Sequence, residues 1–151
     1  KLNAPGSEHW INGKQSDAEC HWVHFNNKYD DVGAAIASGD PDALSVVGVM
    51  LEIDPANGQD EVDWIGTVND AASALVTPDD GPAEDAPFNV YGFLDQLGDQ
   101  SQCFGYYNYL GGLTTPGCNQ LVSFIIIDTP IRINMAQVKI LSKIRLKVFA
   151  L

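Results

Sequence analysis

The residues best suited to chemistry gather in one short stretch, Ala18 to Asn26. This stretch holds a carboxylate, a cysteine and two of the chain's three histidines. Side chains of a β-strand alternate between its two faces, so a strand here would present Glu19, His21 and Val23 on one face. The other face would present Cys20, Trp22 and His24. The two histidines could then not reach one metal ion, and the stretch offers a single imidazole with a carboxylate beside it.

This imidazole has two interpretations. It can be a metal ligand whose orientation is fixed by the neighbouring carboxylate of Glu19. It can also be a histidine packed in a sheet and hydrogen-bonded to that carboxylate, which is the commoner arrangement in proteins. The stretch taken alone favours the second interpretation.

Length and composition indicate one domain with a sizeable core. The chain has 151 residues, of which 45% are hydrophobic. Its longest apolar run, Phe124 to Ile127, is the length of a buried strand and far short of the ~18 residues that cross a membrane. We therefore expect no membrane span.

The charge of the chain is strongly acidic. The formal net charge is -12, and no basic residue lies between Lys28 and Arg132. Such a surface repels nucleic acid and anionic membranes, so we expect neither as a partner. It suits contact with calcium or a carbonate mineral, although no loop has the spacing of a specific calcium site and solubility is the simpler explanation.

Turn and periodicity signals predict several strands and short helices. Asn12-Gly13 is a typical hairpin turn between a strand at 8–11 and a returning strand from Gln15 to Asn26. The other expected elements are a helix over 29–37 closed by Gly39, a strand over 43–53, a helix over 60–76, an acidic loop over 77–87, a strand over 121–128 ended by Pro130, and a helix from Asn134 through about Ile144. This order lacks a β-α-β rhythm, so it predicts a sheet-dominated fold, either β or α+β.

Several separated segments together resemble the α-class carbonic anhydrases. In chain order they are Ser7-Glu8-His9, the stretch 18–26, Leu44 to Gly48, Tyr106 to Pro116 (which resembles the loop before the family's Thr-Thr-Pro signature), and Ile131 to Val138. The resemblance covers nearly all of residues 1–151 and fades in 54–86 and after Ile144. It implies a partial domain with an α+β, sheet-dominated fold: a central, mostly antiparallel twisted sheet with short peripheral helices, incomplete at its ends.

The resemblance also implies an activity and a cofactor. Carbonic anhydrases are zinc-dependent lyases that hydrate carbon dioxide reversibly to bicarbonate and a proton. In the corresponding positions, His21 matches the third zinc ligand and Glu19 the carboxylate that hydrogen-bonds a ligand imidazole. Thr114 matches the threonine that accepts a hydrogen bond from the nucleophile, and Glu8 matches the carboxylate that accepts from that threonine.

The carbon dioxide pocket of the family can be matched in the same way. Its apolar wall corresponds to Val23, Val46, Leu113, Val122 and Phe124, with Thr115 as a polar neighbour. The family usually has tryptophan where Phe124 stands, which predicts a looser wall. Outside the resemblance, Thr114-Thr115-Pro116 would be an ordinary turn, Glu8 a surface acid, and the valines simply core.

One part of the family pattern is missing from this sequence. The family's other two zinc ligands form a His-x-His pair, and no such pair occurs here. The match begins just downstream of where that pair should stand, so the chain is expected to be an internal piece of a carbonic anhydrase. Because a catalytic zinc site needs three protein ligands, we expect the chain alone to bind zinc weakly and to have little hydratase activity.

The remaining histidines and the cysteines have smaller roles in this reading. His9 and His24 are expected to make structural hydrogen bonds, and Cys20 is expected to be a buried thiol behind the His21 face. Cys118 matches a position that forms a disulfide in secreted members, which implies an extracellular protein. Two alternatives stay open: a non-catalytic carbonic-anhydrase-related protein, and an acidic matrix protein that binds calcium or mineral through Asp79, Asp80, Glu84 and Asp85.

Overall fold

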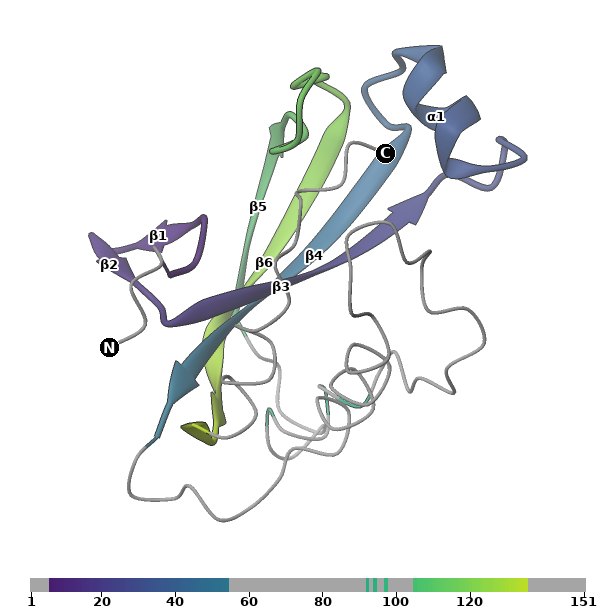
Figure 1. Ribbon diagram of the computed structural model, residues 1–151. Helices are drawn as coiled ribbons and strands as arrows, with labels where there is room; N and C mark the ends of the chain where they lie inside the picture. Colours follow the sequence, from purple (N-terminus) through teal and green to yellow (C-terminus); the bar gives the residue numbers. More distant parts are fainter. Residues whose placement is uncertain (1–5, 55–91, 93, 95–96, 98–104, 136–151) are drawn as a thin grey trace, which may run out of the picture.

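The structure is a computed structural model that describes residues 6–54, 92, 94, 97 and 105–135 (Figure 1). Its elements are β1 (Trp10–Ile11), β2 (Lys14–Gln15), β3 (Ala18–Phe25), α1 (Val32–Ser38), β4 (Leu44–Ile53), β5 (Tyr106–Gly111) and β6 (Val122–Ile133). The helices expected over 60–76 and 134–144 and the acidic loop over 77–87 lie outside the described residues, apart from the start of the second helix. In the described part, no helix is long and apolar enough to cross a membrane.

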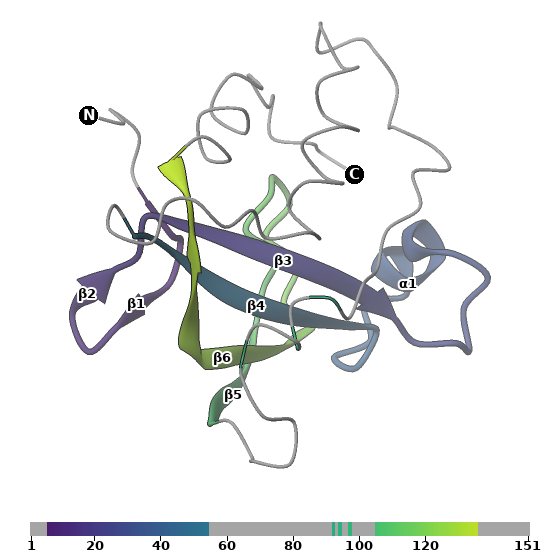
Figure 2. The same cartoon turned by 90° about the horizontal axis from the view of Figure 1, so that it is seen from below.

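A four-stranded sheet forms the centre of the described structure. Its strand order is β3-β4-β6-β5, and β1 pairs with β2 in a separate small hairpin. The β3–β4 and β5–β6 pairs are antiparallel, whereas β4 and β6 run parallel. The strands rotate across the sheet, as Figures 1 and 2 show from two directions. The predicted sheet-dominated, mostly antiparallel and twisted fold is therefore confirmed.

The hairpin turn predicted at Asn12-Gly13 is confirmed. Asn12 has φ 52° and Gly13 has φ 75°, the left-handed pair that a two-residue hairpin turn requires. The returning strand is not continuous, because it divides into β2 and β3. At the break, the backbone N–H of Ser16 donates to Ser7 Oγ at 3.0 Å, and Ser16 O accepts from the Ser7 N–H at 2.9 Å. Ser7 thereby fixes the chain segment that carries Glu8 and His9 next to the start of β3.

The helix expected over 29–37 is present as α1, which ends before Gly39 as predicted but begins three residues later than predicted. The Asp31 side chain accepts a hydrogen bond from the Ala34 N–H at 2.8 Å, which caps the first turn. Gly39 ends the helix in the left-handed conformation, with φ 68°. Val32 and Ile36 then face the same apolar cluster, because they are one helical turn apart.

Two expectations about strands were wrong. Pro130 does not end the strand, because β6 continues to Ile133. The β4–β6 register shifts between Val49 and Leu51, so Pro130 lies in an irregular part of the ladder where its missing N–H removes no regular hydrogen bond. Residues 106–111, expected to belong to a loop, form the edge strand β5, whose aromatic residues suit a pleated surface.

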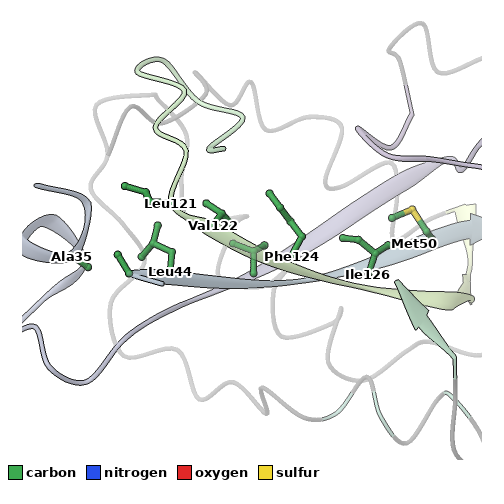
Figure 3. Close-up of a cluster of buried hydrophobic side chains, with 9 residues drawn as sticks. Ala35, Leu44, Met50, Leu121, Val122, Phe124 and Ile126 are labelled. Carbon is green, nitrogen blue, oxygen red and sulfur yellow. The ribbon is translucent and has the colours of Figure 1, made fainter. Parts of the chain in front are cut away.

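The sheet has an apolar cluster on each face. Val49, Leu51, Ile127, Ile131 and Ile133 form one cluster, against which Cys20 and Trp22 pack. The other cluster contains Ala35, Ala43, Leu44, Val46, Met50, Leu121, Val122, Phe124 and Ile126. Figure 3 shows Leu44 and Met50 on β4, Phe124 and Ile126 on β6, and Ala35 on α1. Even-numbered positions of β4 supply one face and odd-numbered positions the other, as the pleat requires.

Candidate functional site

A cavity of about 200 Å³ opens on the second of these faces. It is bounded by β3, β4, β6, helix α1 and the loop that follows β5. Seven of the ten residues singled out from the sequence line it: His21, Val23, Val46, Leu113, Thr114, Thr115 and Phe124. The structure thus places His21 and Thr114 around the same space, although they are 93 positions apart in the chain.

The other three predicted residues lie close to the cavity without lining it. Val122 is buried in the adjacent apolar cluster, with 1% of its surface exposed. Glu19 lies behind His21. Glu8 is about half exposed, and its Oε2 is 3.9 Å from His21 Nδ1. Among the described residues, Thr114 and Glu8 make no hydrogen bond with each other, so that pairing stays a prediction.

Glu19 holds the His21 imidazole from behind. Its Oε1 lies 2.6 Å from His21 Nε2, and its Oε2 accepts from the His9 backbone N–H at 2.9 Å. Burial by itself raises the pKa of this carboxyl, but the hydrogen bonds from His21 and His9 outweigh it and lower the pKa to about 2. An ionised carboxylate can only accept, so His21 Nε2 carries a proton, and in the neutral ring the lone pair is then on Nδ1 and can bind a ligand.

Gly48 makes this arrangement possible. It pairs with His21 across β3 and β4. A Cβ at this position would lie 3.1 Å from Glu19 Oε1 and 2.6 Å from Ile126 Cδ1. Sequence reasoning gave Gly48 no role in the site, although a glycine inside an apolar strand is a signal of close approach by another group.

His9 and Tyr109 are further members of the site. His9 Nδ1 lies 2.5 Å from Glu19 Oε1, and His9 Nε2 lies 2.5 Å from the Tyr109 hydroxyl. The structural role expected for His9 is therefore confirmed. Burial, and then the charges of Glu19 and Glu8, raise the pKa of Tyr109, so its hydroxyl keeps its proton.

The structure also places Tyr109, His24 and further residues that line the cavity. The Tyr109 ring stacks on Phe124 with ring centroids 4.9 Å apart. His24 is exposed on the opposite face of β3, and its side chain makes no hydrogen bond to another described residue. Val32, Ile36 and Asn119 also line the cavity and were missed from the sequence. Helical spacing does assign Val32 and Ile36 to one face, but no local signal shows that this face lies toward His21.

The fit of a zinc ion can be judged from the donor atoms. One potential metal group comprises His9, Glu19 and His21. Zinc with bonds of about 2.0 Å in tetrahedral geometry would hold its donor atoms about 3.3 Å apart. Here both imidazole nitrogens lie 2.5–2.6 Å from the same Glu19 oxygen, so this group is a hydrogen-bond network.

The cavity side of His21 does offer a zinc donor, but it offers only one imidazole. The chain has three histidines. His9 uses both ring nitrogens in hydrogen bonds, and His24 points away on the other strand face. His21 Nδ1 therefore fits as one ligand, while this chain's histidines do not complete a catalytic zinc site.

Calcium binding and secretion gain no structural support. Asp79, Asp80, Glu84 and Asp85 lie outside the described residues. Cys118 is an exposed free thiol in the described part of the chain, and Cys103 is outside it. The extracellular location inferred from Cys118 stays a prediction.

Comparisons with known proteins agree with the resemblance found in the sequence. A family model described as eukaryotic-type carbonic anhydrase matches residues 1–148. Carbonic anhydrase 3 of Rattus norvegicus is 31% identical over 132 residues, covering 87% of this chain and 45% of the relative. Carbonic anhydrase 3 of Equus caballus is 32% identical over 133 residues, covering 88% of this chain and 46% of the relative. The chain thus spans slightly less than half the length of these relatives.

Proposed function

The chain belongs to the eukaryotic-type carbonic anhydrase family, and from this premise we propose that its cavity serves the zinc-dependent, reversible hydration of carbon dioxide to bicarbonate and a proton. The observation that carries the proposal is the shared cavity of His21 and Thr114, which brings a metal-ligand candidate and a hydroxyl residue to one apolar space. Zinc, when bound, supplies the Lewis acid that makes water nucleophilic at neutral pH, a chemistry for which carbonic anhydrases are themselves the standard example.

The residues of this chain have distinct tasks in the proposed reaction. His21 offers Nδ1 as one zinc ligand, and Glu19 keeps that nitrogen unprotonated by holding the ring proton on Nε2. Val23, Val46, Leu113 and Phe124 form an apolar wall against which carbon dioxide is held and from which water is excluded, with Val122 packed behind it. An uncharged, apolar molecule is favoured over water at such a wall.

Thr114 and Glu8 are proposed to orient the attacking oxygen. The Thr114 hydroxyl would accept a hydrogen bond from the attacking oxygen and donate a hydrogen bond to the Glu8 carboxylate. This requires the Glu8 side chain to turn from its place near His21 Nδ1, which is feasible because 54% of that side chain is exposed. Thr115 would add a second polar group at the same wall.

We further propose that this chain alone binds zinc weakly, because it supplies one of the three ligands that a catalytic site needs. Titration of the chain with Zn²⁺ by calorimetry tests this. We expect a weak signal that His21→Ala removes. The matched control is His24→Ala, which removes an exposed imidazole from the other face of the same strand and should leave the signal unchanged.

Two outcomes would contradict the proposal that this chain binds zinc weakly through His21. Tight one-to-one binding by the unmodified chain would show that it holds a complete zinc site. Equal binding by the chain and by His21→Ala would show that this imidazole is not a ligand, and would favour a non-catalytic member of the family. A non-catalytic function is a second candidate because only one of this chain's histidines, His21, faces the cavity.

A further inference from the structure

Helix α1 supplies one wall of the cavity and belongs to the segment that connects β3 to β4. Val32 and Ile36 of this helix line the cavity, and Ala35 between them is fully buried in the adjacent apolar cluster. Figure 1 shows α1 at the end of the sheet where β3 stops and β4 starts. The helix has only seven residues, too few to be stable by itself, so its position depends on contacts with its surroundings.

Side chains join the two chain segments that flank this helix. The hydroxyl of Tyr29, which precedes α1, donates a hydrogen bond to Oδ2 of Asp40, which follows it. The backbone closes the same connecting segment at its base, where the Asn26 N–H donates to Ala43 O at 2.9 Å. The connecting segment is thereby tied both at its base and across the two ends of the helix.

Tyr29 and Lys28 both contact Asp40, but the contact with Tyr29 is the stronger constraint. Lys28 Nζ lies 3.2 Å from Asp40 Oδ2 and 3.1 Å from Asp42 Oδ1, and these exposed ion pairs are screened by water. The Tyr29 ring is half-buried and packs against the apolar cluster that contains Ala35. The Tyr29 hydroxyl, and then Lys28, lower the pKa of Asp40, so its carboxylate is ionised at neutral pH and accepts a strong hydrogen bond. Tyr29 therefore connects the packed core to the segment that follows the helix.

We propose that Tyr29 is a positioning residue, which holds Asp40 across the two ends of helix α1 and so fixes the α1 wall of the cavity. Without this hydrogen bond, the short helix is free to shift on the sheet, and Val32 and Ile36 move away from the wall formed by β4 and β6. A small apolar molecule in the cavity then loses its contacts with α1. The inference rests on the proposed function only in that the molecule held there would be carbon dioxide.

Xenon is a suitable probe of this wall, because it binds in apolar cavities on the order of 150 Å³ and needs no metal. In carbon-13 NMR of the metal-free chain under xenon pressure, we expect the methyl signals of Val32, Ile36 and Val46 to shift. The signal of Val49, on the other face of the sheet, should not shift. In Tyr29→Phe, the xenon-induced shifts at Val32 and Ile36 should be lost, while the shift at Val46 is retained. A purely structural role of Tyr29 would lower the free energy of unfolding but leave these shifts unchanged in the folded molecules.

Three further variants make the test specific. The control Tyr106→Phe removes a hydroxyl from a tyrosine of β5 that is 61% exposed, and all xenon-induced shifts should stay. Asp40→Asn keeps a side-chain oxygen that can accept from Tyr29, so the shifts should be retained. Asp40→Ala removes the acceptor, so the shifts at Val32 and Ile36 should be lost. The Asp40 side chain is 50% exposed, so Asp40→Ala leaves the core intact and serves as a second test if Tyr29→Phe folds poorly.

Three results would overturn this role of Tyr29. Unchanged shifts at Val32 and Ile36 in folded Tyr29→Phe, or in Asp40→Ala, would show that the α1 wall does not depend on the hydrogen bond. Loss of the shifts in Asp40→Asn would assign the effect to the charge of Asp40. Absence of the shifts in the unmodified chain would show that the two α1 side chains do not face the cavity. None of these results involves zinc, so the calorimetric comparison with His21→Ala tests the proposed function separately.

Discussion

The two faces of the central sheet differ, although the same strands form both: one is packed with aliphatic side chains, and the other also carries the cavity and the residues of the candidate site. On one face, aliphatic side chains such as Val49, Leu51 and Ile131 pack closely with Cys20 and Trp22. On the other face, β3 contributes Glu19 and His21 to a hydrogen-bond network beside a cavity of about 200 Å³. Because of the strand pleat, neighbouring residues of β3 can therefore serve core packing and the site in turn.

The two faces also treat polar groups differently. Glu19 is 3% exposed yet stays ionised, because His9 and His21 hydrogen-bond to it and offset the cost of burial. Cys20, its neighbour in sequence, packs on the other face, and no hydrogen bond joins its thiol to another residue in the described part of the chain. Substitutions on the first face should therefore change stability alone, while substitutions around Glu19 and His21 on the other face should change the site as well.

The largest expected effect is a loss of stability on the face that carries Val49, Leu51 and Ile131. Leu51 is 1% exposed in the cluster of aliphatic side chains. Leu51→Ala removes buried methyl groups and leaves a void, so we expect the free energy of unfolding to fall by about 2–5 kcal/mol, measured by urea denaturation. The control is Leu110→Ala, because Leu110 is 75% exposed and its removal should cost less than about 0.5 kcal/mol. Equal losses from the two variants would mean that this face does not form a packed core.

The second prediction concerns thiol reactivity. Burial, and to a smaller extent the charge of Glu19, raise the pKa of Cys20 to about 12, whereas Cys118 is exposed. The thiolate is the reactive form, so at pH 8 we expect Cys20 to be alkylated at least ~100-fold more slowly than Cys118. Mass spectrometry of iodoacetamide-treated Cys103→Ser protein measures both rates on one molecule. Comparable rates would show that Cys20 is not shielded behind β3.

The smallest expected effect is at Gly48, which allows β4 to approach His21 and Glu19 on β3 closely. Gly48→Ala would place a methyl group 2.6 Å from Ile126 Cδ1 and 3.1 Å from Glu19 Oε1. We expect a loss of about 1–3 kcal/mol in stability from overpacking, together with a changed His21 ring-proton signal in NMR. Val47→Ala, one residue earlier on the opposite face, is the control and should leave that signal unchanged. An unaltered signal in Gly48→Ala would show that the close approach of β4 does not position the imidazole.

Much of the fold could be predicted because its signals are local. Asn12-Gly13 encodes a hairpin turn through its left-handed conformations, and Asp31 with Gly39 encodes both ends of a short helix. The continuation of β6 through Pro130 could not be predicted, because it depends on a register shift against β4. The strand character of 106–111 likewise comes from pairing with β6, which no local pattern specifies.

The residue order alone specifies which residues of β3 share a face, because alternation follows from the geometry of any strand. It also contains the carbonic anhydrase motifs and, in β3, a single histidine on the face shared with Glu19 and Val23. Only the tertiary structure decided that Tyr109 meets His9 and that Thr114 shares a cavity with His21. The physical reason is that such contacts depend on strand order and register, which are set by pairing between distant segments.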